Sequence, residues 1–338
     1  THLAKLYIEP TNWCNIDCLT CMRNNWQVET GFMAAETFER IAAGLAALPT
    51  PPSVMFSGIG EPLSHGRIAT MIARVKALGC RTEMITNGTL LTEKRSRELI
   101  DAGLDVLWVS IDGARPESYA DVRLGAELPR VLENLRRFRR LRRPAHHPVP
   151  EIGIAFVAMK RNIGDLPALL ELGKRLGVMH FHVSNLLPHT EQMSGEVLYD
   201  AALRSITYSP SPWLRRLILP KMDLDDLTTG PFRAALNSGY NVVLAGTNLG
   251  LSNDVCTFIE SGSMIVGWDG SVSPCAPLLH THAGYLRGYE RVSYRHLIGS
   301  VLERNLIDLW LDPEYVEYRE RVHRFAFAPC SYCGGCEM

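Results

Sequence analysis

Cys14-Asn15-Ile16-Asp17-Cys18-Leu19-Thr20-Cys21 follows a short β-like run, Lys5-Leu6-Tyr7-Ile8-Glu9. The spacing Cys-x3-Cys-x2-Cys supplies three thiolates from one loop. Thiolates are soft ligands that favour iron–sulfur chemistry, and a cubane cluster has four iron corners, so three ligands leave one iron open to a small molecule. A structural zinc site is normally closed by four ligands, and no fourth Cys or His follows in this loop. The spacing therefore predicts an open iron–sulfur cluster, with an incomplete zinc site or three buried thiols as the alternative.

Short β-branched runs alternate with helix-like stretches from residue 5 to about residue 185, which is typical of a parallel sheet with right-handed helical crossovers. Strands are expected at Leu6–Glu9, Val54–Ser57, Arg81–Thr86, Val106–Asp112, Ile152–Ala158 and His180–Ser184. Helices are expected at 34–48, 66–79, 92–103, 127–142 and 165–176. Six units are fewer than the eight of a closed barrel. We therefore predict an α/β fold in which residues 1–186 form a partial (β/α)6 TIM barrel.

The second half of the chain has a different pattern. Residues 187–250 contain Pro and Gly breakers and are expected to form a connecting segment, with room for one last barrel unit. After Cys256, the run Ser263–Trp268, Asp269-Gly270, Ser271–Ser273 predicts a β-hairpin with an Asp-Gly turn. An amphipathic helix is expected at about 305–325. Residues 251–338 are thus predicted to form a small domain of a β-hairpin plus a helix.

Composition narrows the class of protein. The chain has 338 residues, 46% of them hydrophobic, and a formal net charge of −1. The hydrophobic content is enough to fill a large core. The near-zero net charge produces no overall electrostatic field that would attract nucleic acid or anionic lipid. No apolar run reaches the roughly 18 residues of a membrane span, and the arginines between 136 and 143 suit a solvated helix C-terminus. Nine cysteines in a chain of this length indicate metal ligands in a reducing cytoplasm.

Polar residues follow the predicted strands. In parallel α/β barrels, ligands bind at the carboxyl ends of the strands. The strand ends are Ser57-Gly58-Ile59-Gly60-Glu61-Pro62, Thr86-Asn87-Gly88, Ser110-Ile111-Asp112-Gly113 and Lys160-Arg161. Glycines let the backbone approach a ligand, Glu61 could bind an amino group, and Ser110 and Asp112 share one side of their strand. Each segment alone could be a tight turn, but the series predicts a ligand site.

These residues together resemble the radical S-adenosylmethionine (SAM) enzymes over nearly the whole chain. The resemblance implies a [4Fe–4S] cluster on Cys14, Cys18 and Cys21, with SAM on the open iron, and a reductant such as ferredoxin or flavodoxin. It implies that Gly58, Gly60 and Glu61 meet the amino group of SAM. It also implies that Ser110 and Asp112 meet the ribose or carboxylate, with Lys160 as a further carboxylate partner. The full set of implied cofactor contacts is Ser57, Gly58, Gly60, Glu61, Asn87, Ser110, Asp112 and Lys160.

The remaining cysteines resemble the SPASM or twitch extension of these enzymes. They are Cys256, Cys275 and the run Cys330-Ser331-Tyr332-Cys333-Gly334-Gly335-Cys336. The resemblance implies one auxiliary [4Fe–4S] cluster on Cys256, Cys275 and two of the last three cysteines. Five thiolates cannot close two four-cysteine clusters, so a second auxiliary cluster would need ligands beyond residue 338. A zinc knuckle is the alternative.

Four sequence segments resemble segments of the radical SAM maturases of tungsten-containing aldehyde oxidoreductases. They are Leu6–Asn12, Phe56–Leu63, Phe156–Lys160 and Val183–Pro188. Relatives that oxidise Ser or Cys in sulfatases carry an Asp base directly after a hairpin cysteine, where this chain has Ala276, so that activity is not expected. We predict hydrogen abstraction from a peptide or cofactor-precursor substrate. One alternative is a twitch-type dehydrogenase or epimerase of a small sugar-like molecule. An alternative of another class is a non-catalytic iron–sulfur electron-transfer or zinc-binding protein.

Overall fold

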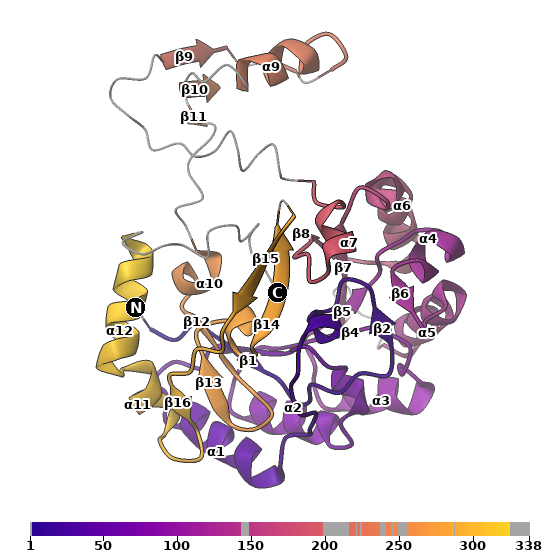
Figure 1. Ribbon diagram of the computed structural model, residues 1–338. Coiled ribbons are helices and arrows are strands. Elements are labelled where there is room, and N and C mark those ends of the chain that lie inside the picture. The colour runs from indigo at the N-terminus through magenta and orange to yellow at the C-terminus, as the bar shows by residue number, and fades with distance from the viewer. Residues whose placement is uncertain are drawn as a thin grey trace.

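A large, mostly parallel sheet is the framework of the computed structural model (Figure 1). The structure describes residues 2–142, 149–198, 216–220, 222–223, 225–236, 241–244, 247–248, 256–286 and 288–324. Six parallel strands follow one another in space in chain order: β1 (Lys5–Ile8), β3 (Ser53–Phe56), β4 (Thr82–Thr86), β5 (Val106–Ser110), β7 (Glu151–Ala158) and β8 (His180–Asn185). The predicted partial barrel and its six strands are therefore confirmed.

Helices cover the outer face of this sheet (Figure 1). They are α1 (Ala35–Ala46), α2 (Ile68–Ala77), α3 (Glu93–Asp101), α5 (Leu128–Leu141) and α6 (Leu166–Leu176). Alternate strand residues point to opposite faces. In β4, Met84 is fully buried, whereas Glu83 and Ile85 line a cavity on the inner face of the sheet. The sheet thus separates a helix-covered core from a lumen.

The predicted β-hairpin in the second half is confirmed and is part of the same sheet. β12 (Ser263–Val266) pairs antiparallel with β13 (Ser271–Ser273), and Gly270 turns the chain with φ +85°. β12 also pairs in parallel with β1 over its whole length, and β16 (Gly299–Ser300) extends the sheet beyond β13. The sequence pattern does not reveal this pairing, which makes one nine-stranded sheet.

The helix expected at 305–325 is wrong as a single element. The chain forms α11 (Leu306–Trp310) and then α12 (Pro313–His323). Asp312 Oδ1 accepts hydrogen bonds from the backbone N–H groups of Glu314 and Tyr315 at 2.9 and 3.3 Å, which caps a new helix. Pro313 has no N–H to continue the preceding helix and suits the first turn of the next one.

The segment 187–250 contains a small sheet of its own in its described part. β9 (Arg216–Leu219) and β10 (Asn241–Leu244) are parallel and linked through α9 (Thr229–Leu236), and β11 (Thr247–Asn248) pairs with β10. The remaining short elements are β2 (Asp17–Cys18), η1 (Met22–Asn25), η2 (Pro62–Ser64), α4 (Pro116–Ala120), β6 (Arg123–Leu124), η3 (Ile163–Asp165), α7 (Glu191–Ser194), α10 (Thr257–Glu260), η4 (Ala276–Leu278), β14 (His282–Leu286) and β15 (Tyr289–Ser293).

Candidate iron–sulfur and SAM site

The cysteine loop leaves the carboxyl end of β1 and is held in shape by two arginines. Arg23 donates from Nη2 to the carbonyl of Ile16 at 2.5 Å and to Asp17 Oδ1 at 2.8 Å. Arg123 lies opposite Cys18 in the short antiparallel pair β2–β6. One guanidinium therefore ties the loop to itself, and the other ties it to the segment after β5.

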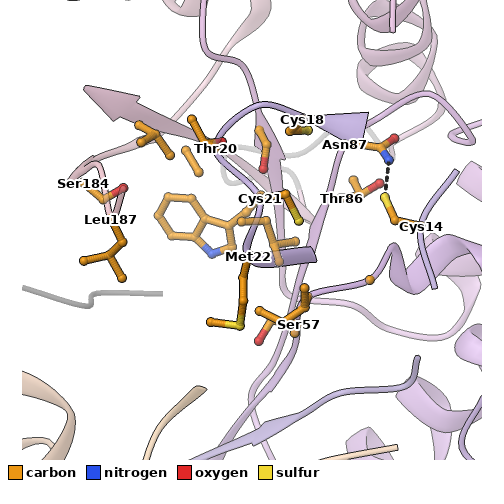
Figure 2. A pocket seen from close by; sticks show the side chains of 18 of the residues that line it. Cys14, Cys18, Thr20, Cys21, Met22, Ser57, Thr86, Asn87, Ser184 and Leu187 are labelled. Carbon is orange, nitrogen blue, oxygen red and sulfur yellow. Dashed lines mark hydrogen bonds between the residues drawn. The ribbon is translucent and has the colours of Figure 1, made fainter. Parts of the chain in front are cut away.

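Cys14, Cys18 and Cys21 are free thiols that line one cavity. Figure 2 shows their side chains converging on the space bounded by Ser57 on one side and by Ser184 and Leu187 on another. Within the described residues, no three side chains of the ligand-forming types His, Cys, Asp and Glu converge closely enough to hold a single metal ion. Three cysteines that line one cavity, with no fourth ligand of these types beside them in the described part of the chain, fit a multi-iron cluster better than a closed mononuclear zinc site.

Burial controls the protonation of these thiols. It raises the pKa of Cys14, and it raises the pKa of Cys18 to about 11, although the nearby Arg123 opposes the shift. A buried thiolate is therefore costly unless a metal neutralises it. Neutral and cationic donors already face the sulfurs, because Asn87 Nδ2 lies 3.7 Å from Cys14 Sγ and Arg123 Nη1 lies 3.7 Å from Cys18 Sγ (Figure 2 for the former). This donor set fits an electron-rich iron–sulfur cluster.

The glycines after β3 pack directly against the cysteine loop. A Cβ atom on Gly60 would lie 2.3 Å from the carbonyl oxygen of Thr11 and 2.5 Å from that of Trp13. Gly58 has φ +134°, and a Cβ there would lie 2.4 Å from Cγ of Glu9. The backbone N–H of Glu61 donates to the Trp13 carbonyl at 2.8 Å. Only glycine permits this close approach at Gly58 and Gly60.

The carboxylate of Glu61 is buried and organises the neighbouring strand end. It accepts from Thr86 Oγ1 at 2.7 Å, from the backbone N–H of Asn87 at 2.7 Å and from the backbone N–H of Leu63 at 2.9 Å. Burial raises the pKa of Glu61, and these three hydrogen bonds oppose the shift. Glu61 thus fixes the turn that presents Asn87 to Cys14.

The structure brings most of the predicted SAM contacts to the cavity. Ser57, Gly58, Gly60, Glu61, Asn87 and Ser110 all line it. Asp112 lies behind the wall, since β5 ends at Ser110 and the fully buried Asp112 pairs with Arg123 at 2.7 Å and accepts from the backbone N–H of Val157. Lys160 is exposed and donates to the carbonyl of Gly195 at 2.7 Å, away from the cavity lining.

Arg123 and His189 are among the cavity residues that were not predicted from the sequence. Arg123 is buried and places its guanidinium between Asp112 and Cys18. His189 is buried, and burial together with the neighbouring His282 lowers its pKa to about 4. The position of Arg123 depends on the β2–β6 pairing, for which two-residue strands leave no periodic signal.

The cavity has a volume of about 530 Å³ and extends along the inner face of the sheet. At one end lie the three cysteines and the strand ends, and at the other lies Lys5, the first residue of β1. The lining therefore spans the strands from end to end.

The auxiliary cysteines are only partly described. Cys256 and Cys275 pack against one buried cluster that contains Tyr7, Phe258 and Ile265. Both also lie near Tyr315, whose pKa is raised by burial. Cys330, Cys333 and Cys336 lie outside the described residues. In the part of the chain that is described, no helix has the length and apolar character that crossing a bilayer requires.

Comparisons with known proteins agree with this geometry. The Radical SAM superfamily matches residues 8–183, and an iron-sulfur cluster-binding domain, SPASM, matches residues 256–337. The tungsten-containing aldehyde ferredoxin oxidoreductase cofactor-modifying protein of Pyrococcus furiosus is 31% identical over 97% of this chain and 86% of its own. The AdoMet-dependent heme synthase of Methanosarcina barkeri is 30% identical over 53% of this chain and 50% of its own.

Solved structures share the fold at low sequence identity. Streptococcus suis SuiB bound to its precursor peptide SuiA has a TM-score of 0.62 and 17% identity, covering 94% of this chain and 67% of SuiB. The structure of anSMEcpe with bound AdoMet has a TM-score of 0.61 and 18% identity, covering 98% of this chain and 88% of its own.

These matches exclude the non-catalytic electron-transfer or zinc-binding alternative, since the chain is an enzyme of a cofactor-dependent family. Its cofactors are SAM, a SAM-binding [4Fe–4S] cluster and auxiliary iron–sulfur. With three cysteines on the lumen of a partial barrel and a cysteine-bearing extension on the same sheet, the chain belongs to the radical SAM superfamily and carries a SPASM-type iron–sulfur domain.

Proposed function

We propose that the chain modifies a cofactor precursor by removing a hydrogen atom from it, in the manner of a maturase for a metal-containing oxidoreductase. The cysteine-lined lumen is the observation that carries this proposal, because one cavity of about 530 Å³ joins the three cysteines to the predicted SAM contacts and to the inner face of the sheet. The likeness to a cofactor-modifying protein over 97% of the chain supports the class of substrate.

When bound, the reduced cluster would supply one electron, and the sulfonium of SAM would accept it and split into methionine and a 5′-deoxyadenosyl radical that can take a hydrogen atom from the substrate. The chain supplies position. Cys14, Cys18 and Cys21 would hold the cluster. Ser57 and Ser110 would offer hydroxyl groups to the polar ends of SAM. A one-electron donor such as a ferredoxin or flavodoxin would replace each electron that is consumed.

We assign the carboxylate of SAM to Arg123 and not to Lys160. Arg123 is a cation on the cavity wall beside Cys18, whereas Lys160 is exposed and bonded to Gly195. Glu61 keeps its predicted role toward the amino group, since its three hydrogen bonds leave acceptor capacity on the carboxylate. Asp112 acts through Arg123 by pairing with it.

The division into parts follows the same logic. We propose that residues 1–186 bind SAM, that 187–250 connect, and that 251–338 hold one auxiliary cluster. Cys256, Cys275 and two of Cys330, Cys333 and Cys336 would be its ligands. The shared cluster of buried residues around Cys256 and Cys275 supports this assignment.

The test is SAM cleavage by anaerobically reconstituted protein with dithionite as reductant. We expect 5′-deoxyadenosine and methionine, together with about eight iron atoms per chain from two cubanes of about four each. Cys14→Ala, Cys18→Ala and Cys21→Ala should each lose about four iron atoms and abolish cleavage. Cys80→Ala is the matched control, because Cys80 is a buried thiol remote from the cavity lining. Cleavage that survives in the three loop variants would refute the proposal.

A further inference from the structure

The lower end of the lumen contains a long ion pair between Lys5 and Glu83, with no direct hydrogen bond between the two groups. Lys5 Nζ lies 3.8 Å from Glu83 Oε2, beyond hydrogen-bond distance, and 5.0 Å from the centre of the Tyr7 ring. Both side chains line the cavity, with 27% and 14% of their side-chain surface exposed. Within the described residues, Lys5 Nζ donates no hydrogen bond. The cation thus lies on the cavity wall, where the Glu83 carboxylate and the face of the Tyr7 ring attract it without taking a hydrogen bond from it.

Glu83 is fixed in place but also has unused capacity. Its Oε2 accepts a hydrogen bond from Trp108 Nε1 at 3.0 Å. The Arg81 guanidinium lies 3.7 Å from Oε1, and this arginine is half exposed and outside the cavity lining. A carboxylate has about four acceptor positions, so several remain open toward the lumen. Charged groups left with unsatisfied hydrogen-bonding capacity in a largely apolar cavity are costly unless something polar pairs with them.

The walls around this pair are flat and aromatic. Tyr7 stacks on Phe258 with ring centroids 4.7 Å apart, and both line the cavity. The Trp108 indole lies over Gly153 of β7, where a Cβ atom would come within 2.4 Å of the ring. The absence of a side chain at Gly153 therefore lets the indole lie across the neighbouring strand. Aromatic faces of this kind bind planar groups by stacking.

From this arrangement we propose that the lower lumen, formed by Lys5, Glu83, Tyr7, Trp108 and Phe258, binds a planar nitrogen heterocycle through a lactam edge. The N–H of the lactam would donate to Glu83, its C=O would accept from Lys5, and the ring would lie against the aromatic walls. A trans peptide group is a poor match, because its N–H and C=O point in opposite directions. A lactam presents both on one edge.

The position suits a substrate that lies below SAM. Glu83 and Asn87 stand four residues apart along β4 and the turn that follows it, which corresponds to roughly 13 Å at about 3.3 Å per residue. Asn87 contacts Cys14, so the polar pair lies about this far from the cluster loop. The inference rests on the proposed function only in placing SAM in the upper part of the cavity, and the binding test below does not require turnover.

The test measures binding of simple probes by calorimetry to reconstituted protein saturated with SAM. Hypoxanthine carries a lactam edge, 1-methylhypoxanthine lacks the N–H, and propionamide has the amide edge without a ring. We expect hypoxanthine to bind with a Kd of about 1 mM or tighter. The other two probes should bind at least about tenfold more weakly. Absence of hypoxanthine binding, or binding of either of the other two probes as tightly as hypoxanthine, would overturn the proposal.

Substitutions of Glu83 and Lys5 test which side chain contacts the N–H and which contacts the C=O of the lactam. Glu83→Gln keeps an acceptor for Trp108 but replaces the other oxygen with a donor, so hypoxanthine should bind about tenfold more weakly and lose its advantage over 1-methylhypoxanthine. Lys5→Met should weaken both lactams alike, and Lys5→Arg should restore binding to within about threefold. Glu98→Gln, a partly exposed carboxylate of α3 outside the cavity lining, is the matched control and should leave probe binding unchanged. Iron content and the unfolding midpoint report whether each variant is folded.

The outcomes also separate this inference from the proposed function. SAM cleavage without lactam binding would refute the lactam-binding inference and leave the proposed function intact. Lactam binding without any SAM cleavage would sink the proposed function and leave the binding site in place. If the Glu83→Gln protein is folded and still binds hypoxanthine more tightly than 1-methylhypoxanthine, Glu83 does not accept a hydrogen bond from the lactam N–H.

Discussion

Glu9 at the end of β1 and His280 after η4 form a buried contact, with His280 Nε2 3.0 Å from Glu9 Oε2. The Glu9 side chain is fully buried and also accepts from the backbone N–H of Ile59 at 3.0 Å. The His280 ring meets the Trp26 ring edge-on at 4.9 Å. The contact therefore joins the first strand, the glycine segment after β3 and the iron–sulfur extension at one point.

Removing this contact should destabilise the protein. His280→Leu leaves the Glu9 carboxylate buried with a single donor, so we expect the free energy of unfolding to fall by about 3 kcal/mol. The measurement is urea unfolding of the reconstituted protein. His323→Leu breaks the more exposed pair with Glu260 and should cost no more than about 1 kcal/mol. Equal losses in the two variants would contradict the role of the buried pair.

Gly60→Ala should displace the cysteine loop. The added methyl group would overlap the carbonyl oxygens of Thr11 and Trp13, which are backbone atoms and cannot rotate away. We expect a loss of about 2 kcal/mol in stability and at least a tenfold loss of SAM cleavage. Gly66→Ala is the control, since its Cβ would meet no atom within 4 Å. Full activity in Gly60→Ala would show that the loop tolerates the shift.

Arg123 and Lys160 should differ in their effect on SAM binding. Arg123→Lys keeps the charge but loses the fork that spans Asp112 and Cys18, so we expect the Kd for SAM to rise about tenfold. Lys160→Met should leave that Kd within about twofold, because Lys160 lies outside the cavity lining. Equilibrium dialysis with labelled SAM distinguishes them. The reverse order of effects would restore Lys160 as the carboxylate partner.

His189 should make the protein less stable in mild acid. Its pKa is about 4 in the folded state and about 6.5 in an unfolded chain, so the unfolded state binds more protons between these values. Its contribution is complete above pH 6.5 and is lost as the pH falls to about 4, by about 3 kcal/mol in all. His189→Gln should flatten the pH profile of unfolding over this range, whereas Lys94→Met, on an exposed helix face, should not. Parallel profiles for wild type and His189→Gln would refute the assignment.

The barrel could be predicted from sequence because each of its units is local. Every strand, helix and capping glycine lies within about 40 residues of the next, and Gly79, Gly103 and Gly177 all adopt positive φ at the predicted helix ends. The positions of the cysteine loop and of the Gly58–Glu61 segment could also be predicted, because both directly follow predicted strands. The break at Pro313 was equally local, and the proline that marks it stands in the sequence.

The remaining features depend on contacts between distant segments. Lys160 follows β7 at the ligand-binding end of the sheet, but its side chain turns to Gly195 in a later loop. Arg123 reaches Cys18 only because two-residue strands pair across 105 positions. The pairing of β12 with β1 joins residues more than 250 positions apart, and the hydrophobic periodicity of the sequence does not predict which strands pair.

That last pairing has a consequence for how the enzyme is built. With β12 in place, the first strand has a hydrogen-bonded neighbour on both sides. A chain cut before residue 256 would leave one row of β1 amides and carbonyls bare, and bare rows recruit other molecules into fibrous or amorphous aggregates. The iron–sulfur extension thus covers the edge of the barrel sheet in addition to carrying metal ligands. A protein truncated before residue 256 should therefore precipitate.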